Sequence, residues 1–367
     1  MTFFDIKNAL SSRISELKQP ILPKQKSNVL IPQQNGERDD TFDILKGVAI
    51  ILMIIGHCDD IHLHAFIFSF HMPIFFFITG YFLKKRPLRD EFRLSIKRLF
   101  IPYIFTSACI CVVAICKDLF DYTWTDGSYS QGMIIKFLLG FKGETAPNWI
   151  IGHIGILWFI LAMFWARCIV VFFINSIKSV KRLCFLFLFL GITGIILEKH
   201  FFVPYCIPQG LSAAGFIYTG VLVQKFKILH NLNIKQILPF FLILWLYTLS
   251  QGGLDMADCF FPTGYVFGLF GSLGFFIILH RLCTNFCCKY SFFGKILLFS
   301  GHYSLIIYCI HAIEKEHINW RAFALLHHLP LEHFEFFQIS IRLAIAFIFT
   351  LIVIKIKPLR ENIFQIK

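Results

Sequence analysis

Hydrophobic residues along the chain gather into ten runs, separated by short polar and charged segments. A helix needs about 20 mainly apolar residues to cross a bilayer, so the longer runs predict transmembrane helices and the shorter ones must recruit flanking residues. The ten runs lie at 42–58, 66–83, 99–116, 150–174, 182–197, 209–223, 234–250, 264–280, 296–313 and 338–354. The pattern therefore predicts an all-α fold, a polytopic membrane helical bundle of about ten transmembrane helices.

Polar segments bound the predicted bundle and set its orientation. Residues 1–41 hold no long apolar core of the kind a signal peptide has, so they are predicted to form an N-terminal tail. The membrane domain then covers 42–357, and a C-terminal tail covers 358–367. Most of the 35 Lys and Arg residues fall on the side of the membrane that carries the N-terminal tail. Because positive loops mark the cytoplasmic side, both termini are predicted to be cytoplasmic.

Composition supports this class of protein. The chain is 57% hydrophobic and 16% charged, whereas soluble domains are about 45–50% apolar and about 25% charged. These values exclude a disordered chain, a coiled coil and a secreted disulfide scaffold. The net charge of +13 follows from the cytoplasmic cations and does not require a nucleic-acid partner.

No metal site is predicted. The 12 Cys residues are scattered, mostly in apolar runs and without a CxxC pair, which is typical of reduced, buried side chains. Several histidines fall in polar loops at spacings that match no strong metal site, so they are interpreted as surface residues. These are His62, His64, His327, His328 and His333.

The first apolar run carries ionisable residues, which are costly inside a membrane and often mark a functional path. Lys46 and His57 are eleven residues apart, which is close to three helical turns, so they share one face about 16 Å apart along the axis. Asp43 lies on the same face. The alternative is a Lys that extends to the interface and an unrelated interfacial His.

The second run places His71 level with His57, two residues before Pro73. A proline leaves a backbone carbonyl unpaired and kinks a helix, so a polar pocket is predicted here. The alternative is a core His bonded to a carbonyl. Arg342 in the last run needs a partner that the sequence does not identify. Further polar candidates in the later runs are His153, Trp158, Tyr303, Ser304, Tyr308 and His311.

A basic cluster follows the second run. Residues 84–98 contain seven cations, more than orientation requires. A cytoplasmic cluster of this kind binds anionic lipid or the phosphates of a soluble ligand, and charge alone does not separate the two.

Two of these stretches together resemble a known family. The run from Phe42 to His57, followed by SFHMPIFFFITG at residues 69–80, is similar to acyltransferase family 3, membrane-bound O-acyltransferases of surface sugars. The SFHMP and FFFITG forms are most similar to the branch that includes fucose 4-O-acetylases. The specific resemblance covers residues 38–103, and weaker family-like features occur at 157–159 and 303–311.

The resemblance assigns roles to several residues. The family carries a basic residue, ten intervening residues and then a His essential for acyl transfer, a spacing that Lys46 and His57 fit, with Lys in place of the commoner Arg. It also carries an Arg-x-x-Arg motif before the third span. Arg98 matches the last position of that motif, but Ser95 stands at the first, where Arg93 or Lys97 would substitute.

The resemblance also implies a reaction. Acetyl-CoA is the expected co-substrate, with no bound cofactor, and Lys46, Arg93, Lys97 and Arg98 are its expected contacts. His57 is the expected catalytic imidazole, as general base or as acyl carrier. His71 and Asp43 complete the expected catalytic group. The residues expected to bind the acceptor are His153, Trp158, Tyr303, Ser304 and His311.

The expected function is therefore an O-acetyltransferase in a bacterial inner membrane that modifies a hydroxyl of a cell-surface sugar or polysaccharide intermediate. The alternative is a transporter or flippase of a polysaccharide or lipid-linked sugar, because intramembrane His and Arg residues also suit a polar path. Only the acyltransferase needs an acyl-CoA site. A structural or sensory protein would leave the histidines without a purpose.

Overall fold

The computed structural model describes residues 39–58, 63–120, 128–142, 145, 153–231, 234–261, 263–285, 291–328 and 334–366. The predicted N-terminal tail, up to residue 38, lies outside the described residues. Within these ranges the chain is α-helical, and the single β-bridge joins Asp255 to Phe260. The prediction of an all-α membrane-type bundle is confirmed.

The helices follow one another along the whole described chain. In order they are α2 Asp40–Gly56, α3 His64–Phe68, α4 His71–Tyr81, α5 Leu88–Ser95, the π-helical η1 Ile96–Phe100, α6 Ile101–Phe120, α7 Ser128–Leu139, the 3₁₀ turn η2 Gly155–Leu157, α8 Trp158–Ser176, α9 Val180–His200, α10 Ile207–Lys225, α11 Ile228–Asn231, α12 Ile234–Ser250, α13 Tyr265–Asn285, α14 Phe292–His302, α15 Ser304–His317, α16 Trp320–Leu326, α17 Phe334–Lys355 and the π-helical η4 Leu359–Ile363.

Six helical stretches in the described residues are long and apolar enough to cross a bilayer, and a seventh forms if the bent pair α14 and α15 is counted as one span. The six are His64–Tyr81, Leu88–Leu119, Gly155–Ser176, Val180–His200, Tyr265–Thr284 and Phe334–Lys355. The other predicted runs also form helices, but α2 and α12 have only 17 residues each. The count of ten spans and the cytoplasmic termini stay predictions.

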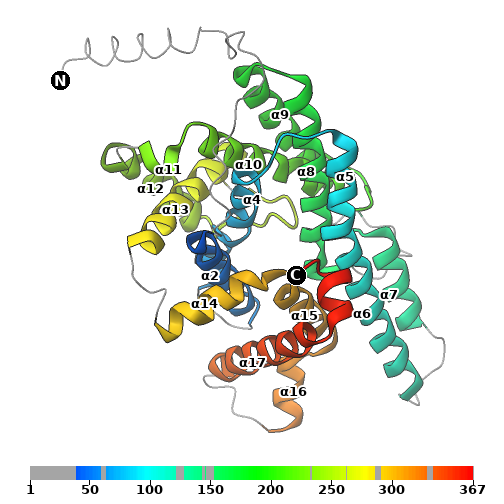
Figure 1. Ribbon diagram of the computed structural model, residues 1–367. Helices are drawn as coiled ribbons and strands as arrows, with labels where there is room; N and C mark the ends of the chain where they lie inside the picture. The colour runs from blue at the N-terminus through cyan, green and yellow to red at the C-terminus, as the bar shows by residue number, and fades with distance from the viewer. Residues whose placement is uncertain are drawn as a thin grey trace, which may run out of the picture.

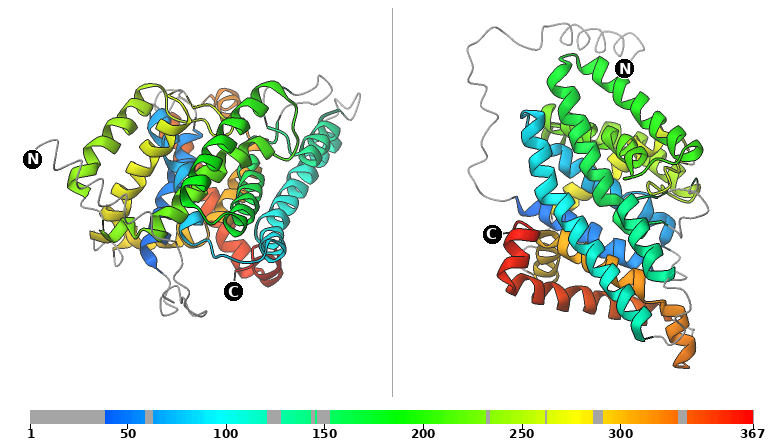
Figure 2. Two further views of the ribbon diagram at one scale, coloured as in Figure 1. Left: turned by 90° about the horizontal axis from the view of Figure 1, so that it is seen from above. Right: turned by 90° about the vertical axis from the view of Figure 1, so that its right-hand side faces the viewer.

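The helices form two groups that meet around α2 and α4 (Figures 1 and 2). In the first group, α5, η1 and α6 form one continuous helical stretch beside α8. Helix α10 packs between α4, α8 and α9. In the second group, α14 lies against α2, and α15 packs against α6 and α17. Large aromatic side chains, including Phe70, Phe76, Phe77 and Phe216, are fully buried where these helices meet.

Glycines let α2 and α14 approach each other at backbone contact. A Cβ atom at Gly47 would collide with the Leu297 carbonyl, and one at Gly301 would collide with the Asp43 carbonyl. Small residues at such positions are typical of helix pairs in membranes. This contact fixes the N-terminal half of α2, the helix that carries His57 at its C-cap.

Two helix breaks differ from the sequence predictions. The predicted kink at Pro73 is instead a break at Ser69 and Phe70, and α4 begins at His71. Pro73 then lies in the first turn of α4, where a missing N–H needs no helical partner. The predicted run 296–313 is also divided at Tyr303, where α14 and α15 meet at 78°.

Candidate active site

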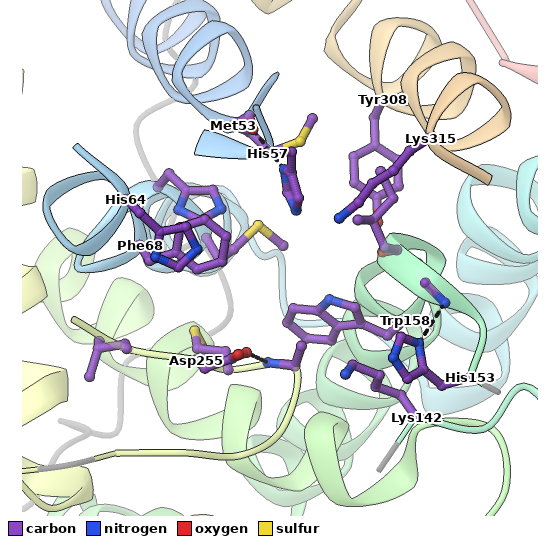
Figure 3. A pocket seen from close by; sticks show the side chains of 17 residues that line it. Met53, His57, His64, Phe68, Lys142, His153, Trp158, Asp255, Tyr308 and Lys315 are labelled. Atoms are coloured by element: carbon purple, nitrogen blue, oxygen red, sulfur yellow. Dashed lines mark hydrogen bonds between the residues drawn. The ribbon is translucent and has the colours of Figure 1, made fainter. Parts of the chain in front are cut away.

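A cavity of about 230 Å³ lies at the C-terminal end of α2 (Figure 3). It is enclosed by the end of α2, by α3 and the start of α4, by the start of α8, by the loop before α13, and by α15. Its lining residues are Met53, His57, His64, Phe68, His71, Met72, Lys142, His153, Gly155, Ile156, Trp158, Leu254, Asp255, Met256, Ala257, Tyr308 and Lys315.

His57 is the C-cap of α2, and its side chain projects into the cavity (Figure 3). Its Nδ1 donates to the Met53 carbonyl at 2.7 Å, which places the proton of the neutral ring on Nδ1. The Nε2 atom is then a free acceptor. The His57 carbonyl, one of those that a helix end leaves without a helical partner, accepts a bond of 2.6 Å from Nη1 of Arg342. Both the ring and the backbone of His57 are therefore held in place.

Behind His57 lies a buried polar cluster of His311, Glu314 and Arg342. The rings of His57 and His311 have centroids 5.5 Å apart. Nδ1 of His311 donates to Glu314 at 2.9 Å, and Nε of Arg342 lies 3.4 Å from the other carboxylate oxygen. Trp320 Nε1 also donates to that carboxylate. Arg342 therefore has the partner that its burial requires.

Glu314 is a buried carboxylate. It follows the apolar part of α15, still lies within that helix, and is only 6% exposed. The helix continues past the apolar run because Glu314 finds a compensating cation on α17. A buried carboxylate is stable only when it is paired and hydrogen-bonded in this way.

His71 also lines the cavity and is 1% exposed. Its Nδ1 donates at 2.8 Å to the Ile67 carbonyl, which also accepts from the Phe70 N–H at 3.3 Å. This is the carbonyl bond that the alternative interpretation anticipated. His64, interpreted from sequence as a surface residue, is exposed and also lines the cavity, stacked on Phe68 with ring centroids 3.8 Å apart.

His153 has the opposite ring arrangement to His57. The Gly155 N–H donates to Nδ1 of His153 at 3.2 Å, so the proton of the neutral ring is on Nε2 and that atom is a donor. Gly155 adopts φ +56, and a side chain there would collide with Glu316. Partial burial lowers the pKa of His153, and the nearby Lys142 lowers it further.

The loop before α13 forms another wall of the cavity. Asp255 Oδ1 accepts from the Ala257 N–H at 3.0 Å, which gives the loop a tight turn. Gln209 Nε2 donates to the carbonyls of Lys142 and Ala257 at 2.9 Å each, which joins two loops far apart in sequence. Burial raises the pKa of Asp255, and the neighbouring Asp258 carboxylate raises it further.

Trp158, Tyr308 and Lys315 complete the cavity. Trp158 is the first residue of α8 and is 5% exposed, and its indole ring faces the cavity (Figure 3). The Tyr308 hydroxyl donates to the Ile156 carbonyl, so this hydroxyl is already engaged. The Lys315 side chain reaches from α15 toward the His57 ring (Figure 3).

The expected donor contacts lie away from this cavity. Lys46 pairs with Asp43 at 2.6 Å near the other end of α2, so Asp43 does not join His57 and His71. Arg93, Lys97 and Arg98 are exposed on α5 and η1.

Next to these three cations, the buried Glu91 binds Arg167 at 2.6 Å and Arg86 at 3.2 Å. Ser95, which stands at the first Arg position of the family motif, donates to Glu91 at 3.2 Å. A buried carboxylate with two arginines therefore anchors α5 to α8.

The expected acceptor residues divide into two groups. His153 and Trp158 line the cavity, and His311 lies directly behind His57. Tyr303 and Ser304 lie at the bend between α14 and α15 and are not among the lining residues.

Sequence reasoning did not select Lys142, Asp255 or Lys315. Each lies in a loop or at the polar end of a helix, where a charged residue is ordinary, and no spacing links them to His57. In the part of the chain that is described, no group of three or more His, Cys, Asp or Glu residues has the arrangement of a metal site.

Comparison with known families decides the class of protein. A family model described as an acyltransferase domain, that of acyltransferase family 3, matches residues 39–356, which include every residue of the cavity. The chain belongs to this family. It is therefore a multi-pass membrane acyltransferase.

The chain is also similar to the nodulation protein NolL of Sinorhizobium fredii (strain NBRC 101917 / NGR234). The two are 36% identical over 89 residues, which covers 20% of this chain and 24% of that relative. The match thus spans only about a quarter of the relative's length. No solved structure matches the chain.

Proposed function

We propose that this acyltransferase is an O-acyltransferase that moves an acyl group, most simply acetyl, from cytoplasmic acyl-CoA to a hydroxyl of a cell-surface sugar or polysaccharide intermediate. Its site of action is the bacterial inner membrane. His57 is the catalytic imidazole, and the cavity beside it receives the acceptor. The observation that carries the proposal is the free Nε2 of His57 at the wall of a cavity that His, Lys and Asp side chains also line, in a chain of this family.

The ring arrangement of His57 suits a general base. With Nδ1 bonded to Met53, Nε2 is the basic atom, and the Arg342 bond to the His57 carbonyl keeps the residue from turning away. General base catalysis needs such an atom within hydrogen-bonding reach of the hydroxyl proton. An acyl carrier would use the same Nε2 atom, and it would leave labelled enzyme when the acceptor is absent.

The proposed reaction transfers one proton and one acyl group. The acceptor hydroxyl oxygen bonds to the thioester carbonyl carbon while its proton passes to Nε2 of His57. The tetrahedral intermediate then breaks its carbon–sulfur bond. The leaving thiolate takes the proton from the imidazolium, so ester and thiol are the products and His57 is regenerated.

The cavity wall suits a sugar-type acceptor. Trp158 offers an aromatic face, Nε2–H of His153 offers a donor, and the Asp255 carboxylate offers an acceptor for hydroxyl groups. We assign acceptor orientation to His153 and Trp158, and His71 supports the same wall. His311 acts from behind His57, and Tyr303 and Ser304 set the bend that places it. A fucose-like unit is the acceptor that the motif branch suggests.

The donor's phosphates are assigned to the exposed cations Arg93, Lys97 and Arg98, because charged phosphates bind Arg strongly. Lys46, half-buried and paired with Asp43, would contact the donor nearer the membrane interior. This placement separates the phosphate end of the donor from the reacting carbonyl along the length of α2.

The test is acyl transfer in membranes that contain either the wild-type protein or His57→Ala. Radiolabelled acetyl-CoA is added, and label is followed into the glycan and glycolipid fractions. We expect transfer in wild type and a loss of at least about 1000-fold in the variant, within the range that a general base contributes. His200→Ala, a terminal α9 histidine outside the cavity, is the matched control.

Full activity in a folded His57→Ala protein would overturn the assignment of this residue. Absence of label in every fraction, with folded wild-type protein present, would instead favour the transporter or a longer acyl donor. Thermal stabilisation by acetyl-CoA separates these two outcomes, because a ligand that binds the folded state raises the unfolding temperature.

A further inference from the structure

Lys315 lines the cavity and forms no ion pair with any described residue. The other cations close to it each form an ion pair. Lys136 binds Glu316 at 2.7 Å, Lys142 binds Asp258, and Arg342 binds Glu314. Across the described ranges, no carboxylate lies within ion-pair distance of the Lys315 ammonium.

The helix itself explains why Lys315 has no carboxylate. Its neighbours Glu314 and Glu316 point about 100° to either side of it, because adjacent residues on a helix do not face each other. Glu314 is turned toward α17 and Glu316 toward α7. Lys315 alone is turned into the cavity, on the side occupied by His57 (Figure 3).

This cation faces the His57 imidazole in the cavity wall rather than an anion (Figure 3). A cation that forms no ion pair at rest is suited to an anion that forms only during the reaction. Acyl transfer forms such an anion, because the carbonyl oxygen becomes negative in the tetrahedral intermediate.

We propose that Lys315 is a further catalytic residue, whose ammonium stabilises the oxyanion of the tetrahedral intermediate formed beside His57. When the acceptor oxygen bonds to the thioester carbon, the carbonyl π electron pair moves to the oxygen, which then lies against Nζ of Lys315. The pair returns when the carbon–sulfur bond breaks. Lys315 keeps its three protons throughout, and the acceptor's proton travels through His57.

Four other polar groups of the cavity are less suited to this role. The Tyr308 hydroxyl already donates to the Ile156 carbonyl. Lys142 is neutralised by Asp258. His57 and His71 each donate through Nδ1 to a backbone carbonyl, so the Nε2 atoms they leave are acceptors and not donors.

The inference rests on the proposed O-acyltransferase function and is tested by separating turnover from binding. Lys315→Met removes the charge and keeps the length of the side chain. We expect kcat to fall about 100- to 1000-fold, the loss typical of one oxyanion donor, while KM for donor and acceptor changes less than about threefold. Lys315→Arg keeps the cation, so its kcat should be at least about tenfold higher than that of Lys315→Met.

Lys178→Met, an exposed lysine just beyond α8, is the matched control and should keep the wild-type kcat. The unfolding temperature of each variant is measured in parallel. If Lys315→Met does not fold, Lys315→Gln takes its place with the same expectation.

Two results would overturn the role of Lys315 and leave the proposed function intact. One is an unchanged kcat in folded Lys315→Met. The other is a raised acceptor KM at unchanged kcat, which would make Lys315 a ground-state contact for an anionic group of the acceptor. Wild-type protein without any His57-dependent transfer would overturn both proposals together.

Discussion

Each end of α2 carries ionisable residues, but the surroundings of the two ends differ. At the N-terminal end, the inner end in the predicted topology, Lys46 is paired with Asp43 on the same helix, next to the glycine contact with α14. At the C-terminal end, the outer end in the predicted topology, His57 faces a cavity built from five other parts of the chain, and its partners are a backbone carbonyl and Arg342 from α17. The inner group is satisfied locally, whereas the outer group is held in place with one reactive atom left free.

This difference shows where chemistry can occur along one helix. A self-paired Lys and Asp can bind a ligand's phosphate or pantetheine end only by exchanging partners, which suits a binding role. An imidazole with a fixed ring and a free Nε2 suits proton transfer. The comparison therefore assigns binding to the inner end and reaction to the outer end.

Outside the catalytic residues, the largest effect is expected from Arg342→Met, which should lower the free energy of unfolding. The change leaves the buried Glu314 carboxylate without its cation, and breaking a buried pair of this kind costs about 3–5 kcal/mol of unfolding free energy. It also removes the bond that holds the His57 carbonyl. Unfolding in detergent, followed by fluorescence or calorimetry, measures the change.

The double variant Arg342→Met with Glu314→Gln supplies the control for that measurement. It removes both charges, so it should recover much of the lost stability. It should not recover activity, because the His57 carbonyl still lacks its bond from Arg342. Equal stability of wild type and Arg342→Met would contradict the buried cluster described here.

A smaller effect is expected at the inner end of α2. Lys46→Ala should raise the apparent donor KM about five- to tenfold, because the donor loses roughly one partly exposed charged contact. The kcat should change little. Asp43→Asn frees Lys46 from its partner and should leave the donor KM equal to or below that of wild type. Initial rates at varied acetyl-CoA check both variants, and a fall in kcat for Lys46→Ala would place chemistry at the inner end.

The smallest effect concerns pH. The folded protein lowers the pKa of His153, so the unfolded chain binds more protons below about pH 6.5, and stability falls as pH decreases through that value. His153→Gln removes this contribution. The unfolding temperature of the variant should therefore fall less between pH 7 and pH 5 than that of wild type. Parallel curves for the two proteins would show that His153 adds nothing to this dependence.

Sequence reasoning reached the helical bundle and the family, because each depends on local pattern, and the shared face of Lys46 and His57 stays a prediction. It did not reach the cavity as a whole. Lys315 and Asp255 come together with His57 only through the packing of α15 and the loop before α13. The bend at Tyr303 and the burial of Glu314 also depend on distant partners, α2 and α17, which spacing along the chain does not encode.

The most direct test of the assignment of reaction to the outer end of α2 is a structure of the wild-type protein with a donor analogue in which a methylene group replaces the thioester sulfur. The account predicts that the carbonyl of the analogue lies in the cavity between His57 and Lys315, with the phosphates near Arg93 and Arg98. An acyl group bound beside Asp43 and Lys46, with the cavity next to His57 empty, would contradict it.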